Sequence, residues 1–171
     1  MKRYSVRPAK PEDIGAVHEL IANQNMVDYG DELRTVDDVQ KIWESINIET
    51  ETFTAHADGH LAGYAELLEG DSIYIYLADR GNVDLAFQLL TIVEEKALAH
   101  KLEKIHLFTK ISEKNNTLLQ LFASNGYKSN LSFIIMQIEM DTPPPVPQWP
   151  DGAHSTQICL GPGRAGNLSG R

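Results

Sequence analysis

Alternating and helical patterns of apolar residues succeed one another along most of the chain. Residues 4–9 alternate as a short strand does. The stretch 10–23 carries Pro11 near its start and places its apolar side chains on one face, which predicts an amphipathic helix. Residues 35–46 show the same helical spacing, with Thr35 in position to cap the first turn. The first third of the chain therefore predicts one strand and two helices.

Residues 52–78 have the pattern of three strands joined by two tight turns. The turns contain Asp-Gly at 58–59 and Glu-Gly-Asp at 69–71, residue types that favour hairpins. The order of all the elements, β-α-α-β-β-β-α-β-α-β, predicts an α/β protein with a mixed central sheet and helices on both faces. The last four expected elements are a helix over 83–100, a strand over 104–110, a helix over 115–126 and a strand over 131–140.

The periodic pattern ends at residue 141, which divides the chain into three parts. Residues 1–141 form the predicted domain. Residues 142–152 are rich in proline, which is typical of a stiff, extended linker. Residues 153–171 are rich in glycine and lack periodicity, so we expect either a disordered tail or the remnant of a second domain.

The negative net charge of the chain makes some classes of binding partner unfavourable. The formal net charge is −9, and the charges after residue 141 (Asp151, Arg164 and Arg171) sum to +1, so residues 1–141 carry −10. Such a surface repels nucleic acid and anionic membranes. No run approaches the ~20 apolar residues of a membrane span, and the N-terminus lacks the apolar core of a signal peptide, so we expect a cytoplasmic protein.

Cysteine and histidine usage offers no sign of a metal site. The single cysteine, Cys159, excludes an internal disulfide and any cysteine-based metal cluster. The six histidines show no metal-ligand spacing. We therefore predict no metal.

The order of elements resembles that of the GNAT superfamily of acetyl-CoA-dependent N-acetyltransferases over roughly residues 3–140. The segment "YSVRPAKPEDIGAVHEL" (4–20) resembles the opening strand and helix of that family, and "LAGYAEL" (61–67) resembles its third strand. The segment "NNTLLQLFASNGYKSN" (115–130) is similar to its late helix. The resemblance implies a GNAT-like fold, acetyl-CoA as cofactor and a small amine as acceptor.

The family's cofactor loop has the form Arg/Gln-x-x-Gly-x-Gly/Ala, whose backbone N–H groups close on the pyrophosphate of coenzyme A at a helix N-terminus. Alignment on the leucine pair 89–90 places Gly81 at the first position, Asp84 at the central glycine and Ala86 at the last position. A register that begins at Arg80 instead also loses the central glycine and puts a large residue at the end. We therefore prefer the first register.

Asp84 then allows two interpretations. In one, Asn82 caps the helix and Asp84 stabilises its first turn through the helix dipole, with no ligand involved. In the other, the loop keeps the shape of a phosphate site but places a carboxylate beside the pyrophosphate, which predicts at least a tenfold loss of affinity. Acetyl-CoA binding is then weak or lost.

The late helix departs from the family at the position of its proton donor. The family's tyrosine, which protonates the departing thiolate, corresponds to Phe122, so a general acid worth roughly 10²–10⁴-fold in rate is missing. The preferred interpretation of Phe122 is a core aromatic on the apolar face of this helix. Ser124 and Tyr127 are the nearest substitutes. Asn116 matches the family's asparagine and is interpreted either as a contact to the pantetheine arm or as a helix cap.

Glu66, on the third expected strand, is the best candidate for a general base, because a carboxylate on an interior strand can have its pKa raised. The alternative is a solvent-facing strand residue. Tyr64, Tyr74 and Tyr76 alternate on neighbouring strands and fit either a substrate cleft or cross-strand core pairs. The predicted cofactor contacts are Leu77, Gly81, Asn82, Val83, Asp84, Leu85, Ala86, Asn116 and Phe122.

Three functions fit these residues. The first is an acetyl-CoA-dependent N-acetyltransferase, and the acidic surface favours a cationic small amine as its acceptor. The second is the non-catalytic half of a tandem GNAT protein of the mycothiol synthase-like plan, with a second GNAT domain as its partner. The third is an interaction domain without cofactor. The sequence leaves the oligomeric state open. The resemblance allows a homodimer paired through the last strand, and the apolar stretch 131–140 needs a cover.

Overall fold

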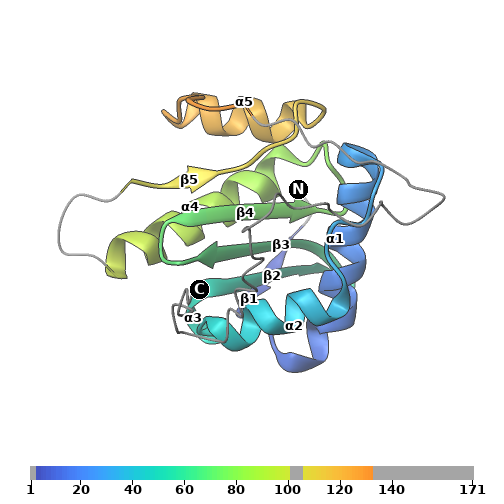
Figure 1. Cartoon of the computed structure of the whole chain (residues 1–171). Coiled ribbons are helices and arrows are strands. Elements are labelled where there is room, and N and C mark those ends of the chain that lie inside the picture. The colour runs from blue at the N-terminus through green and yellow to red at the C-terminus, as the bar shows by residue number, and fades with distance from the viewer. Residues whose placement is uncertain (1–2, 101–105, 133–171) are drawn as a thin grey trace, which may run out of the picture. The chain divides into compact units, whose positions relative to one another are not determined.

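The computed structural model describes residues 3–100 and 106–132, and all elements below belong to a compact unit spanning Met1–Asn130 (Figure 1). Its helices and strands follow the predicted order. The strands are β1 (Ser5–Arg7), β2 (Thr52–Ala57), β3 (His60–Leu68), β4 (Ser72–Leu77) and β5 (Phe108–Thr109). The helices are the 3-10 turn η1 (Pro11–Asp13), α1 (Ile14–Tyr29), α2 (Val36–Ser45), α3 (Ile48–Glu51), α4 (Val83–His100) and α5 (Asn116–Ser124).

The strands of the described residues form one mixed sheet in the order β1-β2-β3-β4-β5. The first four pair antiparallel, whereas β4 and β5 pair in parallel. Both predicted hairpin turns are confirmed. Asp58 and Gly59 have φ values of 51° and 79°, and Glu69 and Gly70 have values of 54° and 75°. Paired positive φ values of this kind match the right-handed twist of the flanking strands.

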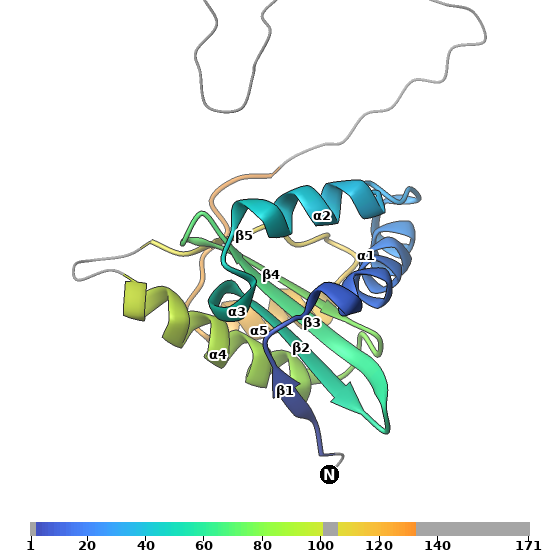
Figure 2. The same ribbon diagram turned by 90° about the horizontal axis from the view of Figure 1, so that it is seen from below.

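Helices cover both faces of the sheet, which confirms the predicted α/β class (Figure 2). One face packs against α4 and α5 through a core that includes Leu67, Ile73 and Leu89. The other packs against α1 and α2 through Ile21, Trp43 and other buried side chains. Alternation along β3 and β4 explains the division, because successive side chains of a strand point to opposite faces.

Two helices differ from the sequence prediction. The first predicted helix, 10–23, is a 3-10 turn followed by α1, which continues to Tyr29 because Gly30 ends it in the left-handed conformation, with φ 79°. The one-turn helix α3 was not predicted. Asn47 caps it by accepting the N–H of Glu49. The predicted cap of α2 is confirmed, since the Thr35 side chain accepts the N–H of Asp38.

The strand expected over 104–110 is shorter in the structure: of its described residues, only Phe108–Thr109 form β5, while 106, 107 and 110 lie outside the strand. The helix expected over 115–126 is α5. Residues 133–140 of the last expected strand lie outside the described residues, as do the linker and tail regions. In the part of the chain that the structure describes, no helix is long and apolar enough to cross a membrane.

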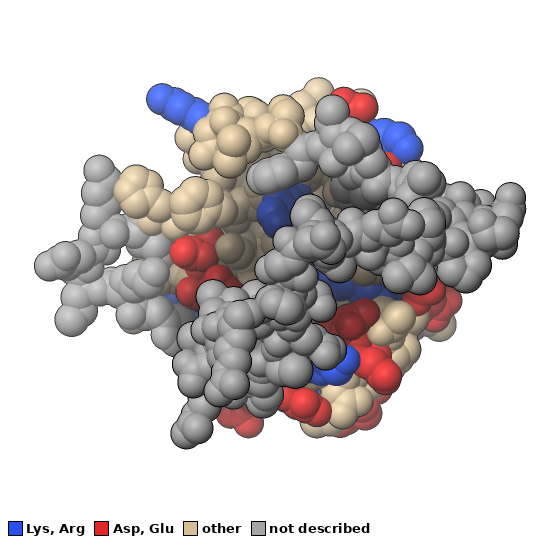
Figure 3. Space-filling model, viewed as in Figure 1, with Lys and Arg blue, Asp and Glu red and all other residues tan. Residues whose placement is uncertain are grey.

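Acidic side chains follow the helices on one side of the molecule. Asp37 and Asp38 lie in the first turn of α2, and Glu49 and Glu51 lie in α3. Figure 3 shows carboxylates along the lower rim of this view, where α2 and α3 lie in Figure 1. The negative charge read from the sequence is thus partly gathered on a helical surface.

A pair of leucines in α4 tests the description of the core. Leu89 is fully buried against the sheet, whereas Leu98 of the same helix is 59% exposed. Leu89→Ala should lower the free energy of unfolding by about 2–5 kcal/mol, because it leaves a cavity that the sheet cannot fill. Leu98→Ala should change it by less than about 0.5 kcal/mol. Urea unfolding of both variants checks this, and equal losses would contradict the assignment of the core face.

Candidate functional site

The loop between β4 and α4 is held by its own polar groups. The Asp79 carboxylate accepts the N–H of Gly81 at 3.0 Å. The Asn82 side chain caps α4 by accepting the N–H of Leu85 at 3.1 Å, and its amide group donates to the Tyr4 hydroxyl at 2.5 Å. This is the helix-cap interpretation of Asn82, and it needs no ligand.

Five of the six backbone N–H groups from Gly81 to Ala86 donate within the chain. Besides the two already named, the N–H of Asn82 donates to the carbonyl of Asp79, that of Val83 to Gly81 and that of Ala86 to Asn82. A pyrophosphate would need these same donors, since an N–H group makes one strong hydrogen bond at a time. The loop therefore has little free donor capacity.

The side chains of the predicted loop residues are divided between solvent and core. Asp84 is exposed in the first turn of α4, where its carboxylate favours the helix dipole, and Val83 is 52% exposed. Leu85 and Ala86 are buried against the sheet. A Cβ atom at Gly81 would meet only the Asp79 carboxylate, at 3.4 Å, so nothing in this loop requires a glycine there.

The outer edge of β4 near Leu77 is also occupied. The pairing of β4 with β5 ends at Ile73 and Thr109. The N–H of Ala78 donates to β3, so the preceding N–H, that of Leu77, points to the opposite edge. There it donates to Oε1 of Gln24 in α1, at 3.1 Å. Leu77 was predicted to contact the cofactor, and its backbone N–H is taken by a side chain of α1.

A second side chain of α1 reaches the same loop. Asp28, one turn after Gln24 and buried, binds Nη2 of Arg80 at 2.5 Å, and the same nitrogen lies 3.4 Å from the carbonyl of Lys114. Sequence reasoning missed Gln24 and Asp28. Their spacing of four residues in a helix was the available signal, but it does not reveal a partner more than fifty residues away.

Helix α5 begins one residue earlier than the cap interpretation of Asn116 implied. Its N-cap is Asn115, whose side chain accepts the N–H of Leu118 at 3.2 Å. Asn115 is buried, whereas Asn116 is exposed as the first residue of the helix. The helix-cap interpretation is therefore wrong for Asn116, and its role as a pantetheine contact stays a prediction.

Phe122, and the Ser124 and Tyr127 side chains that could replace it as proton donors, all interact with neighbouring groups of the protein. Phe122 is buried and meets Tyr127 edge-on, with ring centroids 4.8 Å apart. The Tyr127 hydroxyl donates to Glu94 at 2.8 Å, and the pKa of Tyr127 is raised by burial and by that carboxylate. The Ser124 hydroxyl donates to the carbonyl of Leu121. In this arrangement neither hydroxyl has a proton free for a leaving group.

Glu66 lies in a buried network on the α1/α2 face of the sheet, and not in solvent. Its side chain is 1% exposed. Oε1 accepts Nη1 of Arg34 at 2.7 Å, and Oε2 accepts the Tyr64 hydroxyl at 2.9 Å. The same hydroxyl accepts the indole N–H of Trp43 at 2.9 Å. Both carboxylate oxygens therefore have partners inside the protein, so the arrangement does not favour a general base, and the catalytic role of Glu66 stays a prediction.

The three alternating tyrosines share this face. Tyr64 is fully buried and stacks on Tyr76, with centroids 6.2 Å apart. Tyr74 is half-buried, and the guanidinium carbon of Arg34 lies 5.3 Å from its ring centroid. Two of the three tyrosines are therefore core residues, and the third carries a cation on its ring.

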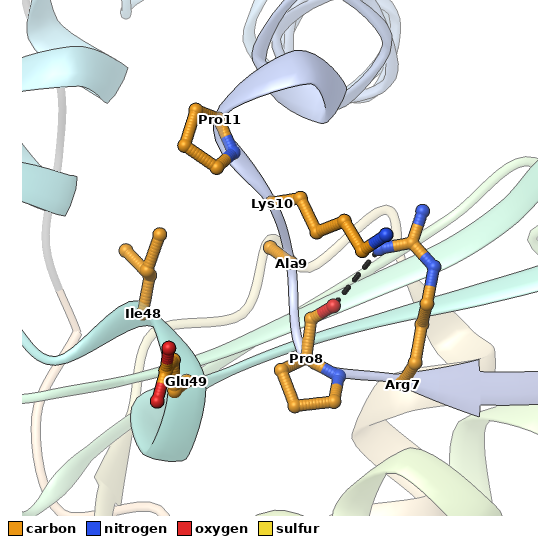
Figure 4. Close-up of a pocket in the computed structure, with 7 residues that line it drawn as sticks. All are labelled: Arg7, Pro8, Ala9, Lys10, Pro11, Ile48 and Glu49. Atoms are coloured by element: carbon orange, nitrogen blue, oxygen red, sulfur yellow. Dashed lines mark hydrogen bonds between the residues drawn. The ribbon is translucent and has the colours of Figure 1, made fainter.

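A pocket of about 440 Å³ lies away from all of these residues (Figure 4). It is lined by residues 7–11 of the N-terminal segment and by Ile48 and Glu49 of α3. Its Arg7 already binds Asp13 at 2.6 Å. In the described residues, no three His, Cys, Asp or Glu side chains are placed to hold a metal ion.

No protein-family model matches the chain, and no curated protein matches its sequence. Solved structures do match. A GCN5-related N-acetyltransferase from Sphaerobacter thermophilus has a TM-score of 0.70 and 25% identity, and the match covers 87% of this chain and 51% of that one. This chain therefore spans about half the length of that protein.

Two further matching structures contain acetyl-CoA or coenzyme A. A Salmonella typhimurium protein described as an acetyltransferase and solved with acetyl-CoA has a TM-score of 0.59 and 17% identity, with 75% of this chain and 81% of that one covered. Spermidine N-acetyltransferase from Vibrio cholerae, solved with CoA and spermine, has a TM-score of 0.53 and 18% identity, with 72% and 79% covered.

These matches agree with the mixed sheet and its helices on both faces. The chain has the fold of the GNAT superfamily of N-acetyltransferases. The cofactor of that superfamily fits this chain poorly, because most amides of the α4 N-terminus and the Leu77 N–H already have partners inside the protein.

The Tyr64–Glu66 contact predicts a pH dependence. Burial and the neighbouring carboxylate raise the pKa of Tyr64 well above its ordinary value of 10.0. The unfolded chain therefore loses the Tyr64 proton first, and stability is lost as pH rises above about 10. Tyr64→Phe should be less stable at pH 7 but should lose less stability between about pH 9 and pH 11 than the wild type. Urea unfolding at these pH values checks this, and parallel losses would contradict it.

Proposed function

We propose that this chain is a non-catalytic GNAT domain, whose own groups occupy the positions where acetyl-CoA would be held. The observation that carries the proposal is the use of five of the six N–H groups from Gly81 to Ala86 within the chain. A pyrophosphate could reach those donors only by breaking internal hydrogen bonds, including the cap of α4.

Charge supports the same conclusion. Asp84 stands in the first turn of α4, where an anion already interacts with the helix dipole. A second anion at this helix end would be repelled by that carboxylate, although solvent weakens the repulsion because Asp84 is exposed. Arg80, the cation of the loop, is neutralised by Asp28.

The lack of a free proton donor at Phe122, Ser124 and Tyr127 supports loss of turnover as well as loss of binding. The Phe122 side chain has no acidic proton to donate, and the hydroxyls of Ser124 and Tyr127 already donate to acceptors within the protein. General acid catalysis typically contributes about 10²–10⁴-fold in rate, so its loss alone would leave a slow enzyme.

The proposed role is that of a half-domain beside a competent GNAT domain. The Sphaerobacter thermophilus protein is about twice as long as the part that this chain matches. Large apolar side chains are exposed in one stretch that ends α1 and begins α2, and contiguous exposed apolar groups are typical of a surface that another domain covers. They are Met26, Val27, Tyr29, Leu33 and Val36.

One observation favours a second candidate, an N-acetyltransferase acting on a small cationic amine. The net charge of −9 would steer cations toward the molecule. Spermidine N-acetyltransferase from Vibrio cholerae, with the same fold, was solved with the polyamine spermine. This function requires acetyl-CoA binding, so one experiment separates the two candidates.

The test is a thermal-shift titration with acetyl-CoA. Ligand at ~100 times its Kd stabilises a native protein by ~2.7 kcal/mol. We expect no shift for the wild type at about 1 mM acetyl-CoA, and a measurable shift for the double variant Gln24→Ala/Asp84→Gly, which frees the Leu77 N–H and removes the carboxylate. Asp37→Gly is the matched control, because it removes a first-turn acid from α2 instead.

A saturable shift of the wild type, together with acetylation of spermine or another amine, would contradict the proposal and favour the enzyme. Silence in all variants would mean that more than these two groups prevents binding. The internal hydrogen bonds of the amides from Gly81 to Ala86, which all these variants keep, would then be the remaining obstacle.

A further inference from the structure

Glu66 and its neighbours have the components of a cation-binding site. The carboxylate is buried, and one of its oxygens is fixed by the Tyr64 hydroxyl, which is itself fixed by Trp43. The ring of Tyr74 lies beside it. A carboxylate that accepts a planar N–H donor, next to an aromatic ring face, is the arrangement by which proteins recognise a guanidinium group.

Arg34 occupies this site in the structure. Nη1 binds Oε1 of Glu66 at 2.7 Å, and the guanidinium carbon lies 5.3 Å from the Tyr74 ring centroid. The Arg34 side chain is 20% exposed whereas that of Glu66 is 1% exposed, so the arginine lies on the solvent side of the carboxylate. Carboxylate, hydroxyl and ring all belong to the sheet, but their cation comes from a loop.

We call the loop that carries Arg34 the arm. It runs from Gly30 to Thr35 between α1 and α2. Leu33 has a φ of 57°, a backbone conformation that residues other than glycine rarely adopt. Polar contacts join it to α1. The ring of His18 lies 2.6 Å from the Glu32 carboxylate and 3.2 Å from the carbonyl of Arg34. Asn25 donates to the carbonyl of Glu32.

We propose that Glu66, Tyr64 and Tyr74 form a binding site for a guanidinium-bearing small molecule, and that Arg34 fills this site as an internal competitor. An external ligand binds when the arm withdraws and its guanidinium replaces that of Arg34 on the carboxylate and the ring. This inference does not rest on the proposed function, because no cofactor contact takes part in it.

The central test uses ethylguanidinium as the probe and Arg34→Ala as the variant. We expect the thermal midpoint of Arg34→Ala to rise by about 3–5 °C when the probe is at about ten times its Kd, and to saturate. The wild type should respond at least about 100-fold more weakly, because the tethered arginine competes at a high effective concentration. Ethylurea, which is neutral, and the double variant Arg34→Ala/Glu66→Gln should show no rise.

A rise that ethylurea reproduces, or that survives Glu66→Gln, would overturn the proposal. So would an Arg34→Ala protein that remains unfolded at every probe concentration, since the site is proposed to accept the probe in place of the side chain. Substitution of ethylammonium for the probe distinguishes the ligand class. We expect a weaker response, because an ammonium group lacks the planar donors that match a carboxylate.

A second variant tests the arm in a chain that keeps Arg34. Glu66→Gln removes the charge that holds the guanidinium, so trypsin should cleave after Arg34 at least about tenfold faster than in the wild type. Glu44→Gln, an isosteric change at an exposed acid of α2, should leave the rate unchanged. Equal acceleration after Arg80 and Lys96, which would report general loosening, or no acceleration after Arg34, would contradict a movable arm.

Discussion

A backbone N–H group at the start of a helix can donate a hydrogen bond either to an acceptor within the chain or to a ligand. The proposed function depends on which of these acceptors the N–H groups at the start of α4 use. Asn82 and Asp79 accept most of the donors that the first turn and its loop present. Asp84 adds the negative charge that a helix N-terminus favours. A phosphate would offer the same two advantages, hydrogen-bond acceptors and negative charge. The helix end is therefore stable without a ligand.

Side chains from the first third of the chain extend this pattern to the sheet. Gln24 gives the edge of β4 an acceptor, and Asp28 gives Arg80 a counter-ion. On the same side of the sheet as α1 and α2, Arg34 provides the counter-ion of Glu66. Each of these contacts satisfies a buried or edge group that would otherwise call for an external partner. Together they describe a domain whose own polar side chains supply the partners of these groups.

The sequence predicted the fold well because its signals are local. The Asp-Gly and Glu-Gly-Asp turns fix the meander by φ preference, and the caps and apolar faces fix most helices. It missed α3, which is one turn long, and it ended the first helix too early, because the polar residues near Tyr29 hide a helical end that Gly30 defines.

The candidate site was predicted only where a single residue departs from a motif. Asp84 and Phe122 could be identified in that way. Gln24, Asp28 and Arg34 could not, because their partners lie 53, 52 and 32 residues away and nothing local marks them. Its place on an interior strand makes Glu66 a candidate base. In the structure, however, Arg34 and Tyr64 bind its two carboxylate oxygens, which the sequence does not reveal.

The most direct test follows the loop amides themselves. In a ¹H–¹⁵N correlation spectrum of the wild type, the amide resonances that report the donors in question are those of Leu77, Gly81, Asn82, Val83, Leu85 and Ala86. The proposed function predicts that about 1 mM acetyl-CoA leaves these resonances in place, because their acceptors lie within the protein. Saturable shifts confined to these amides would show that the cofactor displaces the internal acceptors, and would contradict it.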